Sequence, residues 1–344
     1  MSARYELEPL SSAEAARWDD LIAPYDSRQL FHLGPWLDYL SRSRHLGIRF
    51  WAIREGRDTV GYFCGGALRK GPFKVLGSPL KGWGTNYMGP VADPALDQEA
   101  FLGAIDRLAA RERFAMVELE SPILGDKAMH GFGYEPVEQQ TYVIDLTTGP
   151  DAVWARIDLK SRQKIKKAER LNVVAEETTA PEIADEFYDQ FVEVLARKNL
   201  SPPYGRDCPR ALLRSLEPHQ LVYALRVRDP QGSVIATGIF PHDDRTVYFW
   251  GGASRIAGWS FSPNDLLQWR AIELACRRGL RTYNMCGYGY FKSKFGGLLE
   301  RPTRWHKSYS QMARWARSGY RLYFDQRLRL RASWNRVFRV SNHA

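Results

Sequence analysis

The sequence contains no uninterrupted apolar run close to the roughly 20 residues that a membrane-spanning helix needs. Residues 1–8 lack the basic segment and the following apolar segment of a secretory signal. The four cysteines are widely spaced and no histidines cluster with them: Cys64, Cys208, Cys276 and Cys286. This spacing supports neither a zinc site nor a disulfide framework. We therefore expect no bound metal, no tightly bound cofactor and a cytosolic location.

Positive charge is concentrated at the C-terminal end. The chain has 49 Lys and Arg and 39 Asp and Glu, whereas residues 301–344 hold eleven of the former and one of the latter, which leaves 38 of each elsewhere. Aromatic residues lie among these arginines: Trp315, Tyr320, Tyr323, Phe324, Trp334 and Phe338. Such a tail either contacts nucleic acid or an anionic membrane surface, or packs on the body as a basic helix. Composition does not separate these alternatives.

Four local signals occur twice in the same order. A capping-box pattern occurs at residues 11–14 and 179–182, and a helix start at a proline occurs at Pro35 and Pro209. Two further pairs are a strand–turn–strand (50–63 and 222–240) and a helix followed by a strand (104–119 and 271–285). The spacings within the four pairs are 168, 174, 172 and 167 residues. This agreement predicts a duplicated unit.

Each predicted unit has the order strand, two helices, antiparallel strands, helix, strand. This order predicts an α/β (α+β) class with mixed sheets. Because the 344 residues suffice for two ordinary domains, and turn residues gather near Thr147, we predict domains at 1–147 and 148–312 and a basic tail at 313–344.

Four stretches then bear on function: residues 87–91 (Tyr-Met-Gly-Pro-Val), 140–146 (Gln-Thr-Tyr-Val-Ile-Asp-Leu), 162–168 (Arg-Gln-Lys-Ile-Lys-Lys-Ala) and 291–296 (Phe-Lys-Ser-Lys-Phe-Gly). In this order they resemble the Fem family, the FemAB-like aminoacyltransferases that build peptidoglycan cross-bridges. The resemblance implies tandem GNAT-like domains with a cleft between them, an acceptor amine on the first domain and an activated acyl donor on the second. The donor it implies is aminoacyl-tRNA, or acyl-CoA as in more distant relatives.

The resemblance assigns the catalytic role to Lys292, as the group that stabilises the oxyanion. Acyl transfer to an amine needs such a group, because negative charge builds on the carbonyl oxygen. We expect Tyr290, Phe291 and Lys294 to bind substrate nearby. The alternative is that Lys292 is a solvated loop lysine. Cys286 is expected to be a small core residue, and no Gly-x-Ser-x-Gly elbow occurs.

Residues 255–264 precede a predicted helix, where a GNAT domain has its pyrophosphate-binding loop. Arg255, Gly258, Ser260 and Asn264 are the donor-binding candidates there, since glycine admits the backbone and a helix N-terminus favours an anion. Ser260 departs from the Gly or Ala of that loop, and a turn with an incidental arginine is the alternative.

Residues 160–170 predict a helix with a basic side that includes Arg162, Lys164 and Lys167. These side chains either bind the phosphates of a tRNA or form an ordinary solvated face. On the first domain, Trp36, Asn86 and Tyr87 are expected to line the acceptor side, or to lie in the core.

Two features differ from the Fem pattern. Residues 37–40 (Leu-Asp-Tyr-Leu) lack the lysine with which some Fem enzymes hold a diphosphate, and residues 197–206 form only a short polar loop in place of a helical arm. Three hypotheses result. The first is an aminoacyl-tRNA-dependent transferase acting on an amine of a cell-envelope precursor, small molecule or peptide. The second is an acyl-CoA-dependent N-acyltransferase. The third is a nucleic-acid-binding or membrane-surface protein without activity. The sequence indicates no oligomeric state.

Overall fold

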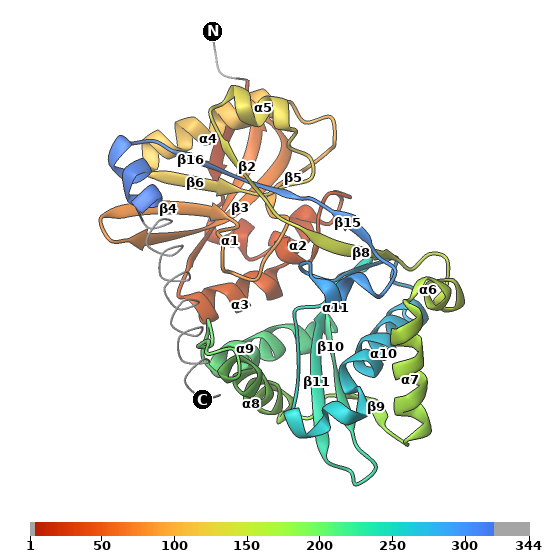
Figure 1. Cartoon of the computed structure of the whole chain (residues 1–344). Coiled ribbons are helices and arrows are strands. Elements are labelled where there is room, and N and C mark those ends of the chain that lie inside the picture. The colour runs from red at the N-terminus through yellow and green to blue at the C-terminus, as the bar shows by residue number, and fades with distance from the viewer. Residues whose placement is uncertain (1–3, 320–344) are drawn as a thin grey trace.

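The computed structural model describes residues 4–319 and forms two lobes, one above the other (Figure 1). Among these residues no helix is both long and apolar enough to cross a membrane. Residues 311–319 are helical, and Trp315 is 69% exposed there. The rest of the predicted basic tail, with Tyr320, Tyr323, Phe324, Trp334 and Phe338, lies outside the described residues.

The N-terminal lobe is built on an eight-stranded sheet, counted within residues 4–319. Its order is β1-β2-β3-β4-β6-β16-β7, and β5 pairs with β3. The strands are β1 (Glu6–Pro9), β2 (Gly47–Glu55), β3 (Asp58–Lys70), β4 (Phe73–Ser78), β5 (Gly89–Ala92), β6 (Met116–Leu119), β7 (Glu135–Glu138) and β16 (Thr303–Ser308). The helices are α1 (Ser12–Ala15), α2 (Trp18–Ile22), α3 (Gly34–Arg44), α4 (Gln98–Glu112) and α5 (Asp126–Gly131).

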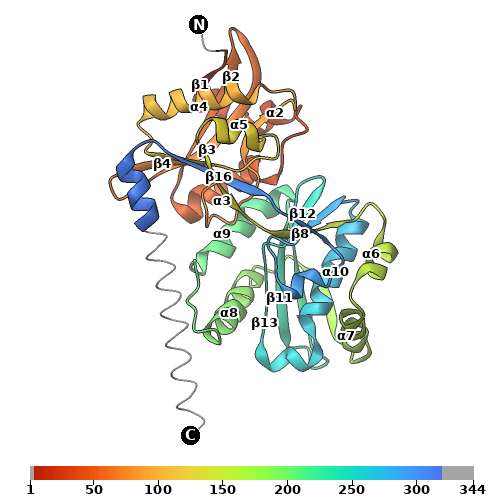
Figure 2. The same cartoon turned by 45° about the horizontal axis from the view of Figure 1, so that its top comes forward.

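The C-terminal lobe contains two sheets, with the strand orders β13-β11-β10-β9 and β12-β14-β8-β15. The strands are β8 (Thr141–Asp145), β9 (Val174–Thr178), β10 (Val222–Arg228), β11 (Val234–Pro241), β12 (Thr246–Tyr248), β13 (Gly251–Ser254), β14 (Thr282–Asn284) and β15 (Leu298–Glu300). The helices are α6 (Pro150–Arg156), α7 (Leu159–Arg170), α8 (Ile183–Ala196), α9 (Asp207–Leu216), α10 (Pro263–Arg277) and α11 (Tyr290–Ser293). Helices α8 and α10 cover opposite faces of the β10–β11 strands, and α7 packs on α10 (Figures 1 and 2).

The two lobes repeat one plan, as the sequence predicts. In each lobe a strand is followed by α-helices (three in the first lobe, two in the second), an antiparallel hairpin, two further strands, a long helix and a strand. In both lobes the strand after the long helix pairs in parallel with an earlier strand, β6 with β4 and β14 with β12. The mixed α/β class is therefore confirmed.

One helix start differs from the prediction. The Ser11–Glu14 capping box is present, but α8 begins at Ile183 and Glu182 makes no capping hydrogen bond through its side chain. The backbone N–H of Ala180 donates instead to the Thr178 hydroxyl at 3.1 Å. The hydroxyl that accepts this bond belongs to Thr178, one residue before the predicted cap Thr179. The prediction of a second capping box was therefore wrong.

The sheets do not end at the predicted boundaries. Strand β8 precedes residue 147, yet it pairs with β14 and β15 of the C-terminal lobe. Strand β16 precedes residue 312, yet it pairs with β6 and β7 of the N-terminal lobe, across which Figure 2 shows it running. The chain therefore crosses between the lobes twice, and the division at 147 and 312 stays a prediction.

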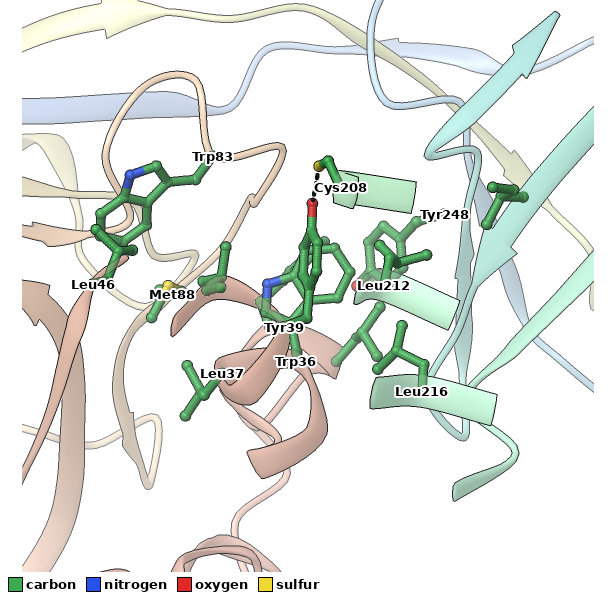
Figure 3. Packing of buried hydrophobic residues seen from close by; sticks show 14 of the residues in the cluster. Trp36, Leu37, Tyr39, Leu46, Trp83, Met88, Cys208, Leu212, Leu216 and Tyr248 are labelled. Carbon is green, nitrogen blue, oxygen red and sulfur yellow. Dashed lines mark hydrogen bonds between the residues drawn. The ribbon is translucent and has the colours of Figure 1, made fainter. Parts of the chain in front are cut away.

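The lobes also share one hydrophobic core. Leu37 and Tyr39 of α3 belong to the same buried cluster as Leu212 and Leu216 of α9 (Figure 3). At its centre the Tyr39 hydroxyl lies 3.3 Å from the Cys208 Sγ atom, and both residues are buried. This continuous packing fixes the position of the N-terminal lobe relative to the strand ends of the C-terminal lobe.

Candidate active site

Lys292 points inward, toward the end of strand β14. It lies on the one-turn helix α11, which follows the turn formed by Gly287 and Gly289. Its Nζ atom donates to the carbonyl oxygens of Met285 at 2.5 Å and Cys286 at 3.2 Å. These two contacts use two of the three N–H bonds of the ammonium, and they hold it where the strand ends.

The surroundings of this ammonium are partly apolar. Lys292 is half-buried, and its Nζ atom lies 5.3 Å from the centroid of the Phe249 ring. Burial lowers the pKa of Lys292 from its ordinary value, and the neighbouring Cys286 opposes this shift. A charge in such a place interacts more strongly with a nearby negative oxygen than a charge in bulk water does.

Lys294 has a different environment. Its Nζ atom lies over the ring of Tyr290, 4.3 Å from the centroid, and Tyr290 is 76% exposed. Phe291, between them in sequence, packs on Phe295, with the ring centroids 5.3 Å apart. The two lysines of this motif therefore diverge: Lys292 lies at the strand end and Lys294 lies near the surface aromatic ring.

The N-terminal lobe reaches the same strand end through Tyr87. The Asn284 side chain hydrogen-bonds to the Tyr87 hydroxyl, and burial raises the pKa of Tyr87, with a further contribution from Glu120. The carbonyl oxygen of the Asn284 amide accepts hydrogen bonds from the Thr141 hydroxyl at 2.7 Å and from the Cys286 backbone N–H at 2.8 Å. Asn284 thus links Tyr87 to the residue whose carbonyl holds Lys292.

Trp36 and Asn86 are the other residues that the sequence predicted on the acceptor side. Trp36 is only 1% exposed and donates its indole N–H to the Thr85 hydroxyl at 3.1 Å. It lies in the core that the two lobes share, so the prediction that it lines a binding site was wrong. Asn86 is half-buried beside Tyr87. The 84–87 loop approaches the C-terminal lobe, since a Cβ atom on Gly84 would lie 3.4 Å from the Trp250 indole nitrogen.

Cys286 does not have the environment of a nucleophile. Burial raises the pKa of its thiol to about 12, and Lys292 offsets only part of this shift. Because the thiolate is the reactive form of cysteine, this thiol is inert at neutral pH. Among the described residues, no three His, Cys, Asp or Glu side chains lie together where they could hold a metal ion.

Most of the predicted donor-binding residues come together between β13 and α10. Gly258 packs so closely on Ile235 that a Cβ atom would approach the Ile235 Cβ atom to 2.6 Å. The Asn264 amide donates to the Ser254 hydroxyl at 2.8 Å, and Lys167 donates to the Ser260 carbonyl at 3.0 Å. Helix α7 is thus tied to this loop.

Arg255 and Lys164 lie beside carboxylates, whereas Arg162 has a nitrogen without a hydrogen-bond partner among the described residues. The Arg255 guanidinium lies 3.5 Å from the Glu193 carboxylate. Lys164 lies 3.9 Å from Asp265, whose carboxyl pKa is raised by burial. Arg162 is half-buried, and its Nε atom has no hydrogen-bond partner among the described residues. Ile165 and Ala168 of α7 are fully buried, which leaves the basic side exposed as predicted.

Sequence patterns did not reveal Asn284, Glu193 or Asp265. Asn284 has only its place at a strand end as a signal. Glu193 contacts a loop 63 residues away, so nothing near it in sequence indicates that contact. A cavity of about 320 Å³ lies beside α1, α2 and α3, away from Lys292. The predicted cleft between the lobes therefore stays a prediction.

Comparisons with known proteins agree with this arrangement. Residues 159–293 match the family described as acetyltransferase (GNAT) domain. This segment contains the loop at 255–262 and Lys292. No curated protein sequence matches the chain.

Solved structures show the same fold over nearly the whole chain. The FemX structure has 13% sequence identity and a TM-score of 0.71, over 89% of this chain and 98% of that chain. The C-terminal domain (DUF2156) of an Agrobacterium fabrum protein assigned as a lysylphosphatidylglycerol synthetase has 16% identity and a TM-score of 0.57, over 89% and 95%. A tandem GNAT protein from the clavulanic acid biosynthesis pathway has 14% identity and a TM-score of 0.52, over 88% and 98%.

At these identities the structural likeness establishes the fold, and the match over residues 159–293 establishes the domain type of the C-terminal lobe. The chain therefore has the twin-GNAT fold that FemX also has, and residues 159–293 match the acetyltransferase (GNAT) domain family.

Proposed function

We propose that the chain moves an aminoacyl group from aminoacyl-tRNA to an amine of a cell-envelope precursor, a small molecule or a peptide. The observation that supports it best is the half-buried ammonium of Lys292, which two backbone carbonyls hold beside the strand end that Tyr87 also reaches. This arrangement provides a fixed positive charge at a junction of the two lobes.

The proposed reaction is direct aminolysis of the tRNA ester. The acceptor nitrogen attacks the ester carbonyl, a C–N bond forms, and negative charge builds on the carbonyl oxygen. Lys292 stabilises this oxyanion through its remaining N–H bond. When the C–O bond to the ribose breaks, the amine proton leaves and the ribose oxygen gains a proton. The reaction needs no acyl-thioester intermediate on Cys286, in accord with the raised pKa of its thiol.

The basic side of α7 supports tRNA as the donor. Lys160, Lys164 and Lys167 are exposed, while the buried Ile165 anchors the opposite side of the helix. Phosphates supply much of the binding energy for nucleic acids, so three cations in a row on a rigid helix suit a tRNA backbone. In this proposal the protein works in the cytoplasm, and a peripheral position at the inner membrane face would suit a lipid-linked acceptor.

For the acceptor, the structure favours an amine without a nucleoside diphosphate. At the position where some Fem enzymes have a diphosphate-binding lysine, Leu37 and Tyr39 are buried. Asp38 accepts hydrogen bonds from Arg42 and Ser215. A carboxylate there would repel a diphosphate. We therefore do not propose a UDP-linked peptidoglycan precursor.

The second candidate function is acyl transfer from acyl-CoA. It is favoured by the match of residues 159–293 to an acetyltransferase domain and by the position of Arg255. The same attack on a thioester would release CoA as its thiol.

The test measures which donor the purified protein consumes. Radiolabelled aminoacyl-tRNA or acetyl-CoA is incubated with the protein and an amine panel of hydroxylamine, lysine and a lysine-containing peptide, and enzyme-free hydrolysis is subtracted. We expect amide formation from aminoacyl-tRNA, with a loss of about 10²–10³-fold in kcat for Lys292→Ala, the usual effect of removing one oxyanion donor. Lys127→Ala, which removes an exposed lysine from α5 in the other lobe, is the matched control and should stay near wild type. Unchanged turnover in Lys292→Ala would refute the mechanism, and consumption of acetyl-CoA alone would establish the second candidate.

A further inference from the structure

The loop between β13 and α10 has the physical features of an anion-binding site. Arg255 supplies a cation at its start, and the Ile256 backbone N–H points out of the loop to a side-chain acceptor. Gly258 lets the loop pack directly on Ile235, and the loop ends at the N-terminus of α10, a helix of 15 residues. An N-terminus of this kind attracts negative charge.

A carboxylate of the protein itself already occupies this position. Glu193, near the end of α8, accepts a hydrogen bond from the Ile256 backbone N–H at 2.8 Å. Its other carboxylate oxygen lies 3.5 Å from the Arg255 guanidinium. The Glu193 side chain is 31% exposed, so it is partly shielded from water. Both groups that would bind a phosphate at the start of the loop are thus paired with Glu193.

The other groups of the loop are also satisfied within the chain. The Trp259 indole N–H and the Asn264 amide both donate to the Ser254 hydroxyl, at 3.1 and 2.8 Å. Arg197, one helical turn after Glu193, lies over the Trp259 ring, 4.2 Å from its centroid. At the N-terminus of α10, the carboxylate of the first-turn residue Asp265 is buried. The N-terminus of α10, which would also attract an anion, therefore already has the Asp265 carboxylate beside it.

We propose that Glu193 determines donor specificity by excluding acyl donors that carry a diphosphate, of which acyl-CoA is the relevant class. A diphosphate at this loop must displace Glu193 from Ile256 and Arg255, or lie beside its charge. Like charges at such a distance oppose binding, and a broken ion pair adds to the cost. An aminoacyl ester at the 3′ end of a tRNA carries no diphosphate and meets no such penalty. The inference rests on the proposed aminoacyl transfer, because it explains which of two donors that reaction uses.

The test removes the charge and measures CoA binding by the full-length protein. Isothermal titration with CoA, and separately with inorganic pyrophosphate, compares wild type with Glu193→Gln and Glu193→Ala. Glu182→Gln is the matched control, since it removes one negative charge from the other end of α8 at an exposed position. We expect CoA to bind about tenfold more tightly or better to the Glu193 variants and unchanged to the control. Adding Arg255→Ala to Glu193→Ala should remove the gain, because the freed guanidinium is the expected phosphate partner.

The outcomes separate this inference from the proposed function. Equal CoA affinity in wild type and both Glu193 variants would overturn the role of Glu193, whatever the transfer assay shows. A gain that Arg255→Ala does not remove would overturn the loop as the binding position. A gain in CoA affinity together with no transfer from aminoacyl-tRNA would support the role of Glu193 and refute the proposed function. Thermal melting of each variant checks that the fold is intact, and Glu193→Ala covers the case in which the Gln amide keeps the Ile256 contact.

Discussion

Replacing Gly287 by alanine should disturb the Lys292 ammonium, which we propose stabilises the oxyanion, through one added methyl group. Gly287 has a φ of 137°, a backbone conformation that alanine rarely adopts, and its Cβ atom would lie 3.2 Å from the Lys292 Nζ atom. Gly289 has nearly the same φ, 134°, but a Cβ atom there would have no atom within 4 Å. The two substitutions therefore introduce the same backbone strain, and only one of them contacts Lys292.

The expected effects follow from this difference. Backbone strain of this kind costs about 1–3 kcal/mol, so both variants should lose a similar part of their free energy of unfolding. In Gly287→Ala the ammonium must also move by a few tenths of an ångström, away from the carbonyls of Met285 and Cys286. Since a misplacement of about 1 Å can cost about 10²-fold in rate, we expect a loss of about tenfold in kcat.

The assay combines chemical unfolding with single-turnover amide formation from aminoacyl-tRNA, at a temperature where both variants are folded. Gly289→Ala should keep kcat within about twofold of wild type, because its only defect is strain that leaves the Lys292 contacts in place. An equal loss of kcat in the two variants would show that backbone strain, and not the position of the ammonium, limits the rate. That result would refute the reasoning.

Two further predictions follow from the structure. Because burial lowers the pKa of Lys292, the transfer rate should fall with rising pH at a lower pH than for an exposed lysine, and Lys292→Arg, which stays charged, should lose this alkaline limb in a pH–rate profile. The sign for stability is opposite: the unfolded chain binds this proton more tightly, so the contribution of Lys292 to stability rises with pH between the folded and unfolded pKa values. Leu212→Ala, in the core that both lobes share, should cost about 2–5 kcal/mol and lower a single common unfolding transition, as followed by hydrogen exchange of α3 and α9; two separate transitions would contradict a shared core.

Local patterns predicted the order of elements well. The proline near the start of α3 and the β10–β11 hairpin depend on residues close in sequence, where backbone preferences act directly, whereas α9 begins at Asp207, two residues before Pro209. The second capping box failed at the same level: α8 begins at Ile183, and Thr178, the residue before the predicted cap, accepts a backbone hydrogen bond in the preceding turn. Patterns in sequence do not say which of two nearby hydroxyls accepts such a bond.

Contacts between distant residues were not predictable in this way. The pairing of β16 with β6 depends on strands more than 180 residues apart, and neither strand has a motif that names its partner. Trp36 illustrates the same limit: its place on α3 was predictable, but its burial in a core to which both lobes contribute was not. For the site, the Phe-Lys motif indicated Lys292, whereas Asn284 and Glu193 required the folded geometry.

The return of β16 to the first sheet has a consequence for biosynthesis. Strand β16 (residues 303–308) lies between β6 and β7 and hydrogen-bonds to both. Within the described residues, β7 is joined to the sheet through β16 alone. While a ribosome is still translating the second half, the first lobe must wait with one side of β6 open and with β7 not yet joined to the sheet. Its edges stay open to wrong pairing until almost the entire polypeptide has emerged, so this lobe matures after the GNAT lobe that follows it in the gene.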